Sequence, residues 1–420
     1  MREFPEGFLF GAATSSHQVE GGNVHNDWWD WEQAGKIEDG TTSGDAAGWW
    51  AGRAEEDLAK AAELGHRAHR MSLEWSRLEP EVGRFDGDAF ERYREILRFA
   101  ASRDLTILCT LNHFTLPRWI AKMGGWTHPN VPALFEGFAT RAADALGPHV
   151  ALWATLNEPS VLAYMGYAGT RWPPGRGSMR ACFTAMRHML DAHALGYRAL
   201  HRTLPQPRVG IVLNMPRFAP ADPSRALDRW AAAAQDWAFN GAALHALAEG
   251  RYAFPLRAIP APAPLLRRSF DWVGLNFYGR YDVRFDPSAV GEAFGRHVQT
   301  PTVRTERNDW GQPDPGAMVA QLERLSALGV PLYVTENGTC DETQRTDYLR
   351  SHLEAIADAA HEGLDVRGYF AWSLVDNFEW AEGWSTRFGH LALDRETQAR
   401  TERETARAYA EVIARGARAD

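Results

Sequence analysis

Eight short apolar runs, separated by stretches with helical periodicity, constrain the fold of this 420-residue chain more than any other feature. The stretch 53–64, for example, has apolar residues at helical spacing and stops before Gly65, a residue that suits a helix C-terminus. The strand-like runs are 8–16, 68–75, 105–114, 152–158, 209–215, 272–278, 332–336 and 366–375. Strands that alternate with helices form parallel sheets. Because no Ser/Gly-rich linker interrupts the series, we predict one α/β domain over residues 1–420, a single (β/α)8 TIM barrel.

Polar and aromatic residues gather on these runs, near or just beyond the end of each. They are Gln18, Arg70, Glu74, Asn112, His113, Asn157, Glu158, Asn214, Asn276, Tyr278, Glu336, Asn337, Trp372, Glu379 and Trp380. Any one of them could be a hydrogen-bonded loop or core residue. The carboxyl ends of barrel strands share one face, however, so their joint placement predicts a polar binding site at that face.

Two glutamates follow apolar runs at distant points of the chain. Glu158 lies in the sequence Thr-Leu-Asn-Glu-Pro, and Glu336 lies in Tyr-Val-Thr-Glu-Asn-Gly. In a barrel both side chains would face one pocket. Two facing carboxyl groups suit glycoside hydrolysis, because one protonates the leaving oxygen while the other attacks the sugar or activates water.

The segment 372–384 interleaves aromatic and polar side chains. It places Trp372, Phe378, Trp380 and Trp384 around Asp376, Asn377, Glu379 and Glu382. Pyranose rings have apolar C–H faces and hydroxyl rims, so flat aromatic surfaces beside fixed hydrogen-bonding groups suit them. An amphipathic barrel-closing loop is the alternative explanation, and the pattern favours a carbohydrate site over it.

Seven stretches, in order along nearly the whole chain, resemble glycoside hydrolase family 1, the β-glucosidase-like retaining glycosidases. They are 8–21 (FLFGAATSSHQVEG), 70–77, 112–114, 155–159, 276–278, 334–338 and 372–380. A lone Asn-Glu-Pro or Glu-Asn-Gly would be weak evidence. Seven matches in the family's order are specific.

The resemblance implies a role for each matched site residue. Glu158 resembles the family's acid/base and Glu336 its nucleophile, while Arg70, Asn276 and Tyr278 would orient the nucleophile and the sugar's 2-hydroxyl region. The residues similar to the family's glycone-binding set are Gln18, His113, Asn157, Trp372, Glu379 and Trp380, with Trp372 as the floor under the ring. The resemblance implies no metal and no organic cofactor.

Two features depart from the family's pattern. Phe277 stands where a second tyrosine is frequent, and the short segment between Tyr278 and Leu332 leaves little room for elaborate loops. Variable loops build the part of such a pocket that holds the leaving group. The aglycone preference is therefore not predicted, whereas the catalytic set is intact.

Charge and cysteine content narrow the partners and the compartment. The net charge is −9 with both signs mixed along the chain, so we expect no nucleic-acid partner. Cys109, Cys182 and Cys340 are odd in number and widely spaced, which fits neither a disulfide framework nor a zinc site. Neither a signal-peptide pattern nor a membrane-spanning apolar run occurs, so we expect a cytoplasmic protein without a membrane partner.

The main prediction is an exo-acting, retaining β-glycosidase, foremost a β-glucosidase, with β-galactosides and β-fucosides as further substrates. It would remove terminal non-reducing residues from small β-glycosides and short oligosaccharides. Three alternatives stay open. A 6-phospho-β-glycosidase needs groups that hold phosphate, yet Glu379 and Trp380 stand in the relevant loop. A transglycosylase would pass the same intermediate to an alcohol, and an inactive sugar-binding barrel would be expected to have lost one glutamate.

Overall fold

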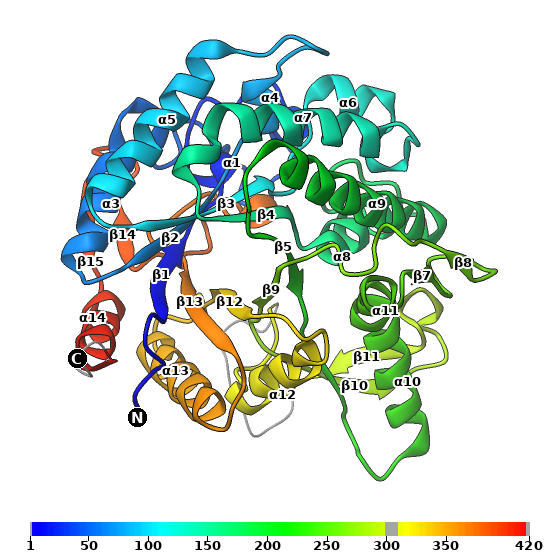
Figure 1. Cartoon of the computed structure of the whole chain (residues 1–420). Coiled ribbons are helices and arrows are strands. Elements are labelled where there is room, and N and C mark those ends of the chain that lie inside the picture. The colour runs from blue at the N-terminus through cyan, green and yellow to red at the C-terminus, as the bar shows by residue number, and fades with distance from the viewer. Residues whose placement is uncertain (1, 299–309, 417–420) are drawn as a thin grey trace.

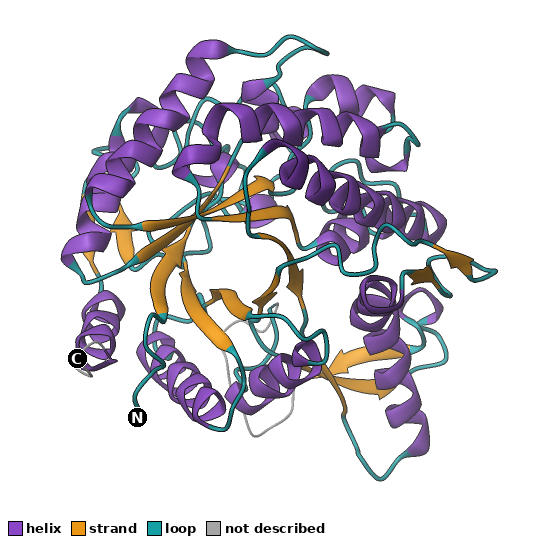
Figure 2. Ribbon diagram, in the orientation of Figure 1, coloured by secondary structure: helices purple, strands orange, loops and turns teal. Residues whose placement is uncertain are grey.

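A closed barrel of eight parallel strands forms the centre of the computed structural model, which describes residues 2–298 and 310–416. Helices surround the strands on the outside (Figures 1 and 2). In their order around the barrel, the strands are β1 (Leu9–Ala13), β2 (Ala68–Ser72), β3 (Thr106–Asn112), β4 (Leu152–Asn157), β5 (Val209–Asn214), β9 (Trp272–Asn276), β12 (Leu332–Asn337) and β13 (Val366–Trp372). The predicted (β/α)8 barrel is confirmed, and each predicted run overlaps one barrel strand.

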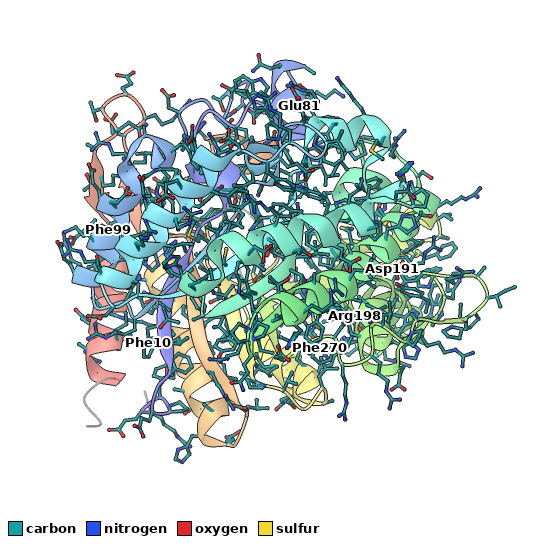
Figure 3. The ribbon with its side chains drawn as sticks, turned by 45° about the horizontal axis from the view of Figure 1, so that its top comes forward. Phe10, Glu81, Phe99, Asp191, Arg198 and Phe270 are labelled. Carbon is teal, nitrogen blue, oxygen red and sulfur yellow. The ribbon has the colours of Figure 1, made fainter. Side chains whose placement is uncertain are left out.

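Most of the longer helices fill the connections between strands, and α14 follows the last strand. They are α3 (Arg53–Glu63), α5 (Gly87–Ser102), α7 (Val131–Leu146), α9 (Met179–Thr203), α10 (Ala226–Asp236), α11 (Ala242–Glu249), α12 (Pro315–Ser326), α13 (Arg345–His361) and α14 (Glu404–Gly416). Gly65 follows α3 at φ 85°, the left-handed conformation that ends a helix, as its sequence predicts. In Figure 3, α7 crosses beside α9, on which Asp191 and Arg198 are labelled.

Short helices occupy several of the loops. They are α1 (Ser16–Val19), α2 (Asp27–Gln33), α4 (Trp75–Leu78), α6 (Arg118–Met123) and α8 (Pro159–Leu162). Small strands form two further pairs, β7 (Arg251–Tyr252) with β8 (Ala261–Pro262) and β14 (Leu391–Leu393) with β15 (Arg400–Glu402).

The barrel strands are buried along nearly their whole length. Every residue of β2, β3 after Thr106, β4, β9 and β12 is buried, as expected for parallel strands that pack against helices outside and against one another's side chains inside. Several predicted runs continue past the strand, because their last residues leave the hydrogen-bonded ladder and turn into the loops of the carboxyl face.

A second sheet lies outside the barrel, beside the connections that follow β5 and β9 (Figure 1). It consists of β6 (Arg217–Pro220), β10 (Arg280–Phe285) and β11 (Gly295–Val298), and α10 packs on it. The one-turn π-helix η5 (Trp237–Gly241) continues α10. The segment between Tyr278 and Leu332 contains the β10–β11 hairpin and α12.

None of the helices in the described ranges is long and apolar enough to cross a membrane. Cys109 and Cys182 are buried, and neither forms a disulfide.

Candidate active site

The carboxyl ends of the strands open into one cavity of about 760 Å³. The two predicted catalytic glutamates both line it: Glu158 directly follows β4, and Glu336 lies in β12. Five other predicted site residues line the cavity as well: His113, Tyr278, Trp372, Glu379 and Trp380. The remaining four, Gln18, Arg70, Asn157 and Asn276, lie behind these side chains and bond to them. The structure therefore brings the whole predicted set together.

Glu336 accepts a hydrogen bond on each carboxylate oxygen. Arg70 Nη1 donates to Oε1 over 2.5 Å, and the Tyr278 hydroxyl donates to Oε2 over 2.6 Å. The guanidinium is itself held in place, since it is buried and also donates to the Thr335 carbonyl and to Asn157 Oδ1. Bonds from a cation and a phenol to both oxygens stabilise a carboxylate and fix its direction.

Glu158 sits where β4 ends, with φ +47°. That left-handed conformation is strained for a side chain with a Cβ, and the bond from its N–H to the Val212 carbonyl (2.9 Å) helps to hold it. The Nδ2 atoms of Asn276 (2.7 Å) and Asn214 (2.9 Å) both donate to Oε1. Because Oε1 is an acceptor twice over, a proton on this carboxyl group resides on Oε2.

Burial, together with the negative charge of Glu336, raises the pKa of Glu158 to about 8. The amide bonds from Asn276 and Asn214 oppose this shift without cancelling it. Glu158 is therefore protonated at neutral pH, while Glu336 has the contacts of an anion. One cavity thus holds a proton donor and a carboxylate.

Asn276 contacts Glu158 rather than the predicted nucleophile Glu336, and its predicted place near the sugar's 2-hydroxyl group stays a prediction. Its Oδ1 accepts a hydrogen bond from the Thr335 hydroxyl (2.7 Å), which turns its amide nitrogen toward Glu158 and Asn157 Oδ1. No described hydrogen bond joins Asn276 to Glu336, although the two residues are register partners in β9 and β12. Asn276 therefore holds the proton donor rather than the carboxylate.

Glu379 lies in the loop after β13 and accepts two hydrogen bonds on Oε2, from Gln18 Nε2 (3.1 Å) and Asn377 Nδ2 (2.9 Å). Gln18 is fixed in turn by the Ser15 hydroxyl, which donates to its Oε1. Burial raises the pKa of Glu379 to about 8, so that Oε1 carries a proton at neutral pH. A carboxyl group in this state both donates to and accepts from hydroxyl groups.

His113 is a neutral imidazole in a defined tautomer. Asn157 Oδ1 accepts from Arg70 and Asn276, so its Nδ2 faces His113 Nε2 at 3.1 Å and makes that nitrogen the acceptor. The ring proton is then on Nδ1, and burial, with the nearby Arg70 charge, keeps the pKa well below its usual range. The ring lies nearly parallel to Trp372 (6.1 Å between centroids) and to Trp380 (6.0 Å).

Two other residues at the predicted strand ends serve the scaffold instead. Glu74 is buried and accepts hydrogen bonds from Ser16, Ser76 and Thr115. Asn112 donates to the Thr115 carbonyl over 2.7 Å. Both brace the loops behind the cavity.

Sequence reasoning gave no role to two features of this cavity. The first is Asn214, whose place at the end of β5 was the available signal and whose amide contacts Glu158. The second is the other end of the cavity, which aromatic residues of η5, α10 and the loops line. These residues follow no barrel periodicity, so nothing in the sequence linked them to the site.

No group of three or more His, Cys, Asp or Glu in the described ranges is arranged to hold a metal ion. The acid, carboxylate, amide and aromatic groups of the cavity suit a neutral, hydroxyl-rich ligand ring.

Known proteins resemble this chain along almost its whole length. A β-glycosidase from Pyrococcus horikoshii has 38% sequence identity and a TM-score of 0.90, covering 98% of this chain and 95% of that one. The family 1 β-glucosidase of Thermotoga maritima has 30% identity and a TM-score of 0.92, with 99% of both chains covered. A bifunctional β-D-glucosidase/β-D-fucosidase from Bifidobacterium breve is 32% identical over 98% of each chain. The sequence model of glycosyl hydrolase family 1 matches residues 1–417, and the chain belongs to that family.

Proposed function

We propose that this glycoside hydrolase is a retaining, exo-acting β-glucosidase that also accepts β-fucosides and β-galactosides. The observation that carries the proposal is the opposite environment of the two glutamates, with Glu158 protonated by burial and Glu336 held as a carboxylate by Arg70 and Tyr278. The names of the relatives from Thermotoga maritima and Bifidobacterium breve support glucosides and fucosides as substrates.

In the first step, a carboxylate oxygen of Glu336 attacks the anomeric carbon. The bond from that carbon to the aglycone oxygen breaks, and the oxygen takes the proton from Oε2 of Glu158. A covalent glycosyl-enzyme and a free alcohol result. Arg70 and Tyr278 keep the attacking carboxylate oriented before the reaction, because each bonds to one of its oxygens.

In the second step, Glu158 is ionised and acts as the base. It takes a proton from water, the water oxygen bonds to the anomeric carbon, and the bond to Glu336 breaks. Two displacements on one carbon restore its original configuration. Asn276 and Asn214 support Glu158 in this state, since their donated hydrogen bonds favour the ionised form.

We propose that the buried polar end of the cavity holds one terminal sugar residue. We propose that Gln18, His113, Asn157 and Glu379 bind its hydroxyl groups while Trp372 and Trp380 pack on its apolar surfaces. The 6-phospho sugar alternative is not favoured, since the relatives are named for activity on β-glucosides and β-fucosides.

Proton NMR of the reaction products tests the mechanism. With a β-glucoside as substrate, we expect β-glucose to appear first and the α-anomer to grow in by mutarotation. First appearance of the α-anomer would mean a single displacement by water and would refute the role of Glu336 as nucleophile.

We further propose that residues 1–420 act as one catalytic domain located in the cytoplasm, with small β-glycosides as partners. The buried, disulfide-free Cys109 and Cys182 are consistent with a reducing compartment.

A further inference from the structure

The lining of the cavity becomes mainly aromatic away from the two glutamates. Its other end is lined by aromatic side chains that come from outside the barrel, namely Phe183, Trp230, Trp237, Phe239, Phe254 and Phe294. We call these six residues the apolar arm. They belong to α9, the continuous α10–η5 stretch, the loop after β7 and the β10–β11 hairpin, so four separate segments converge on one space.

Two polar side chains beside the apolar arm, those of Trp237 and Gln235, are already bonded within the protein. Trp237 Nε1 donates to the Phe254 carbonyl over 2.7 Å. Gln235 Nε2 donates to the carbonyls of Glu292 and Gly295, and its Oε1 contacts His297 Nε2 at 3.2 Å. A second sugar ring would need free hydrogen-bonding groups here, because hydroxyl groups that lose water without gaining a partner weaken binding.

Two residues of the apolar arm are unusually exposed. Phe254 is 68% exposed and Trp230 is 50% exposed, and both still line the cavity that contains Glu158 and Glu336. Trp230 is held by Phe294, with 5.7 Å between ring centroids. Single exposed aromatic residues are ordinary, but several that line one cavity mark a surface made for an apolar ligand.

We propose that the apolar arm binds the linear alkyl chain of an amphiphilic β-glycoside, so that alkyl β-glucosides are preferred to oligosaccharides. This inference rests on the proposed β-glucosidase function and names its aglycone class. The reaction is the same as for other β-glycosides. The bond from the anomeric carbon to the alkoxyl oxygen breaks, the alkanol leaves with the proton from Glu158, and a water oxygen then bonds to the anomeric carbon.

The test is the dependence of kcat/KM on chain length for methyl, butyl, hexyl and octyl β-D-glucosides, all kept below their micelle-forming concentrations. Each methylene group that enters an apolar site should raise kcat/KM by about two- to fourfold. Cellobiose and cellotriose should give values below that of the octyl glucoside. A flat or falling series, or a higher value for the cello-oligosaccharides, would overturn the proposal.

Paired surface variants assign the effect to the apolar arm. The double substitution Trp230→Ser with Phe254→Ser should flatten the series while leaving the methyl glucoside nearly unaffected. Leu227→Ser with Ile259→Ser is the matched control, since these residues are 51% and 80% exposed, lie in the same region and do not line the cavity. We expect the control to keep the full slope, and an equal loss in both double variants would refute the assignment.

Two further measurements separate the ways in which the proposal can fail. Sedimentation with phosphatidylcholine vesicles should leave the enzyme in solution. Co-sedimentation that the Trp230 and Phe254 substitutions abolish would make this surface a lipid contact and overturn the proposal.

Hydrolysis of p-nitrophenyl β-D-glucoside is the reference reaction. No hydrolysis would refute both the β-glucosidase function and the inference that rests on it. Hydrolysis with a flat alkyl series would sink the inference alone.

Discussion

The two ends of the cavity are built by different means. We call the buried polar end, which contains Glu158 and Glu336, the sugar end. Its side chains belong to barrel strands and the loops next to them, and hydrogen bonds such as Arg70 to Glu336 and Asn276 to Glu158 fix their positions. At the apolar arm, segments outside the barrel supply rings that contact one another, for example Trp230 with Phe294 and Phe239 with Tyr164.

The difference separates what the fold determines from what its additions determine. In a barrel the carboxyl ends of the strands always meet at one face, whatever the surrounding loops are. The fold itself therefore fixes the positions of catalytic side chains at those ends. Ring contacts in the connecting segments can change without disturbing that chemistry, and they decide which leaving group fits. Substitutions at the sugar end should therefore change rates on every substrate, whereas substitutions in the apolar arm should change the order of substrates.

The largest effect is expected at the carboxylate. Glu336→Ala should lower kcat/KM by about 10⁵- to 10⁶-fold, the order of loss that follows removal of a catalytic nucleophile. Added azide should restore some turnover and yield the α-glycosyl azide, because it attacks from the face that Glu336 leaves empty. Glu342→Ala, an exposed carboxylate in the loop after β12, is the control and should retain full activity. A β-glycosyl azide from Glu336→Ala would show that the roles of the two glutamates are exchanged.

Replacement of the proton donor should have an effect that depends on the leaving group. Glu158→Ala should lower kcat/KM by about 10²- to 10⁴-fold on alkyl glucosides, which need protonation, and far less on dinitrophenyl glucosides, which do not. With azide this variant should give the β-glycosyl azide. Equal losses on the two substrate classes would remove Glu158 from the role of acid.

Glu379 tests the sugar end without touching the reacting carbon. We expect its carboxyl group to bond to the 4- and 6-hydroxyls, at about 1.5 kcal/mol each, so that Glu379→Ala lowers kcat/KM on glucosides by about 100-fold. A β-fucoside lacks the 6-hydroxyl and should lose only about 10-fold by the same argument. The measurement is kcat/KM on the matched p-nitrophenyl β-glucoside and β-fucoside, and equal losses would exclude the 6-hydroxyl contact.

The sequence predicts the sugar end well because its residues lie at the ends of strands, and the apolar periodicity of the sequence locates those strands. Eight apolar runs identified the barrel strands, and the residues at their ends converge on one cavity. Asn276 shows where this reasoning stops: its side-chain direction depends on the Thr335 hydroxyl, and register alone pairs it with Glu336.

The apolar arm could not be predicted, and the reason is physical. Phe183, Trp230 and Phe254 lie in connecting segments whose paths depend on tertiary packing rather than on a repeating pattern. In the sequence each of them is indistinguishable from an ordinary surface or core aromatic residue. Only their convergence in space distinguishes them.

The pH profile of the wild type should show the raised pKa of Glu158. The acid must be protonated in the free enzyme, so kcat/KM should fall as pH rises through about 8, by tenfold per unit well above it. Glu379 also has a pKa of about 8, and the Glu379→Gln variant separates the two groups. The overall activity of this variant should be lower, but its kcat/KM should still fall above a pH of about 8, the basic limb of the profile. Loss of this basic limb in Glu379→Gln would show that Glu379, not Glu158, causes it.

The smallest effect is expected at Asn214, which lines the cavity and contacts Glu158. Its amide donates to Glu158 and thereby favours the ionised form, so Asn214→Ala should raise the pKa of Glu158 and move the basic limb upward by up to about one pH unit. The alkyl chain-length series should keep its slope, because Asn214 contacts the proton donor and is not among the six rings of the apolar arm. A profile of kcat/KM against pH for methyl and octyl β-glucosides measures both quantities. An unmoved limb would mean that Asn276 alone sets the hydrogen bonding of Glu158, and a changed slope would mean that the two ends of the cavity are not separable.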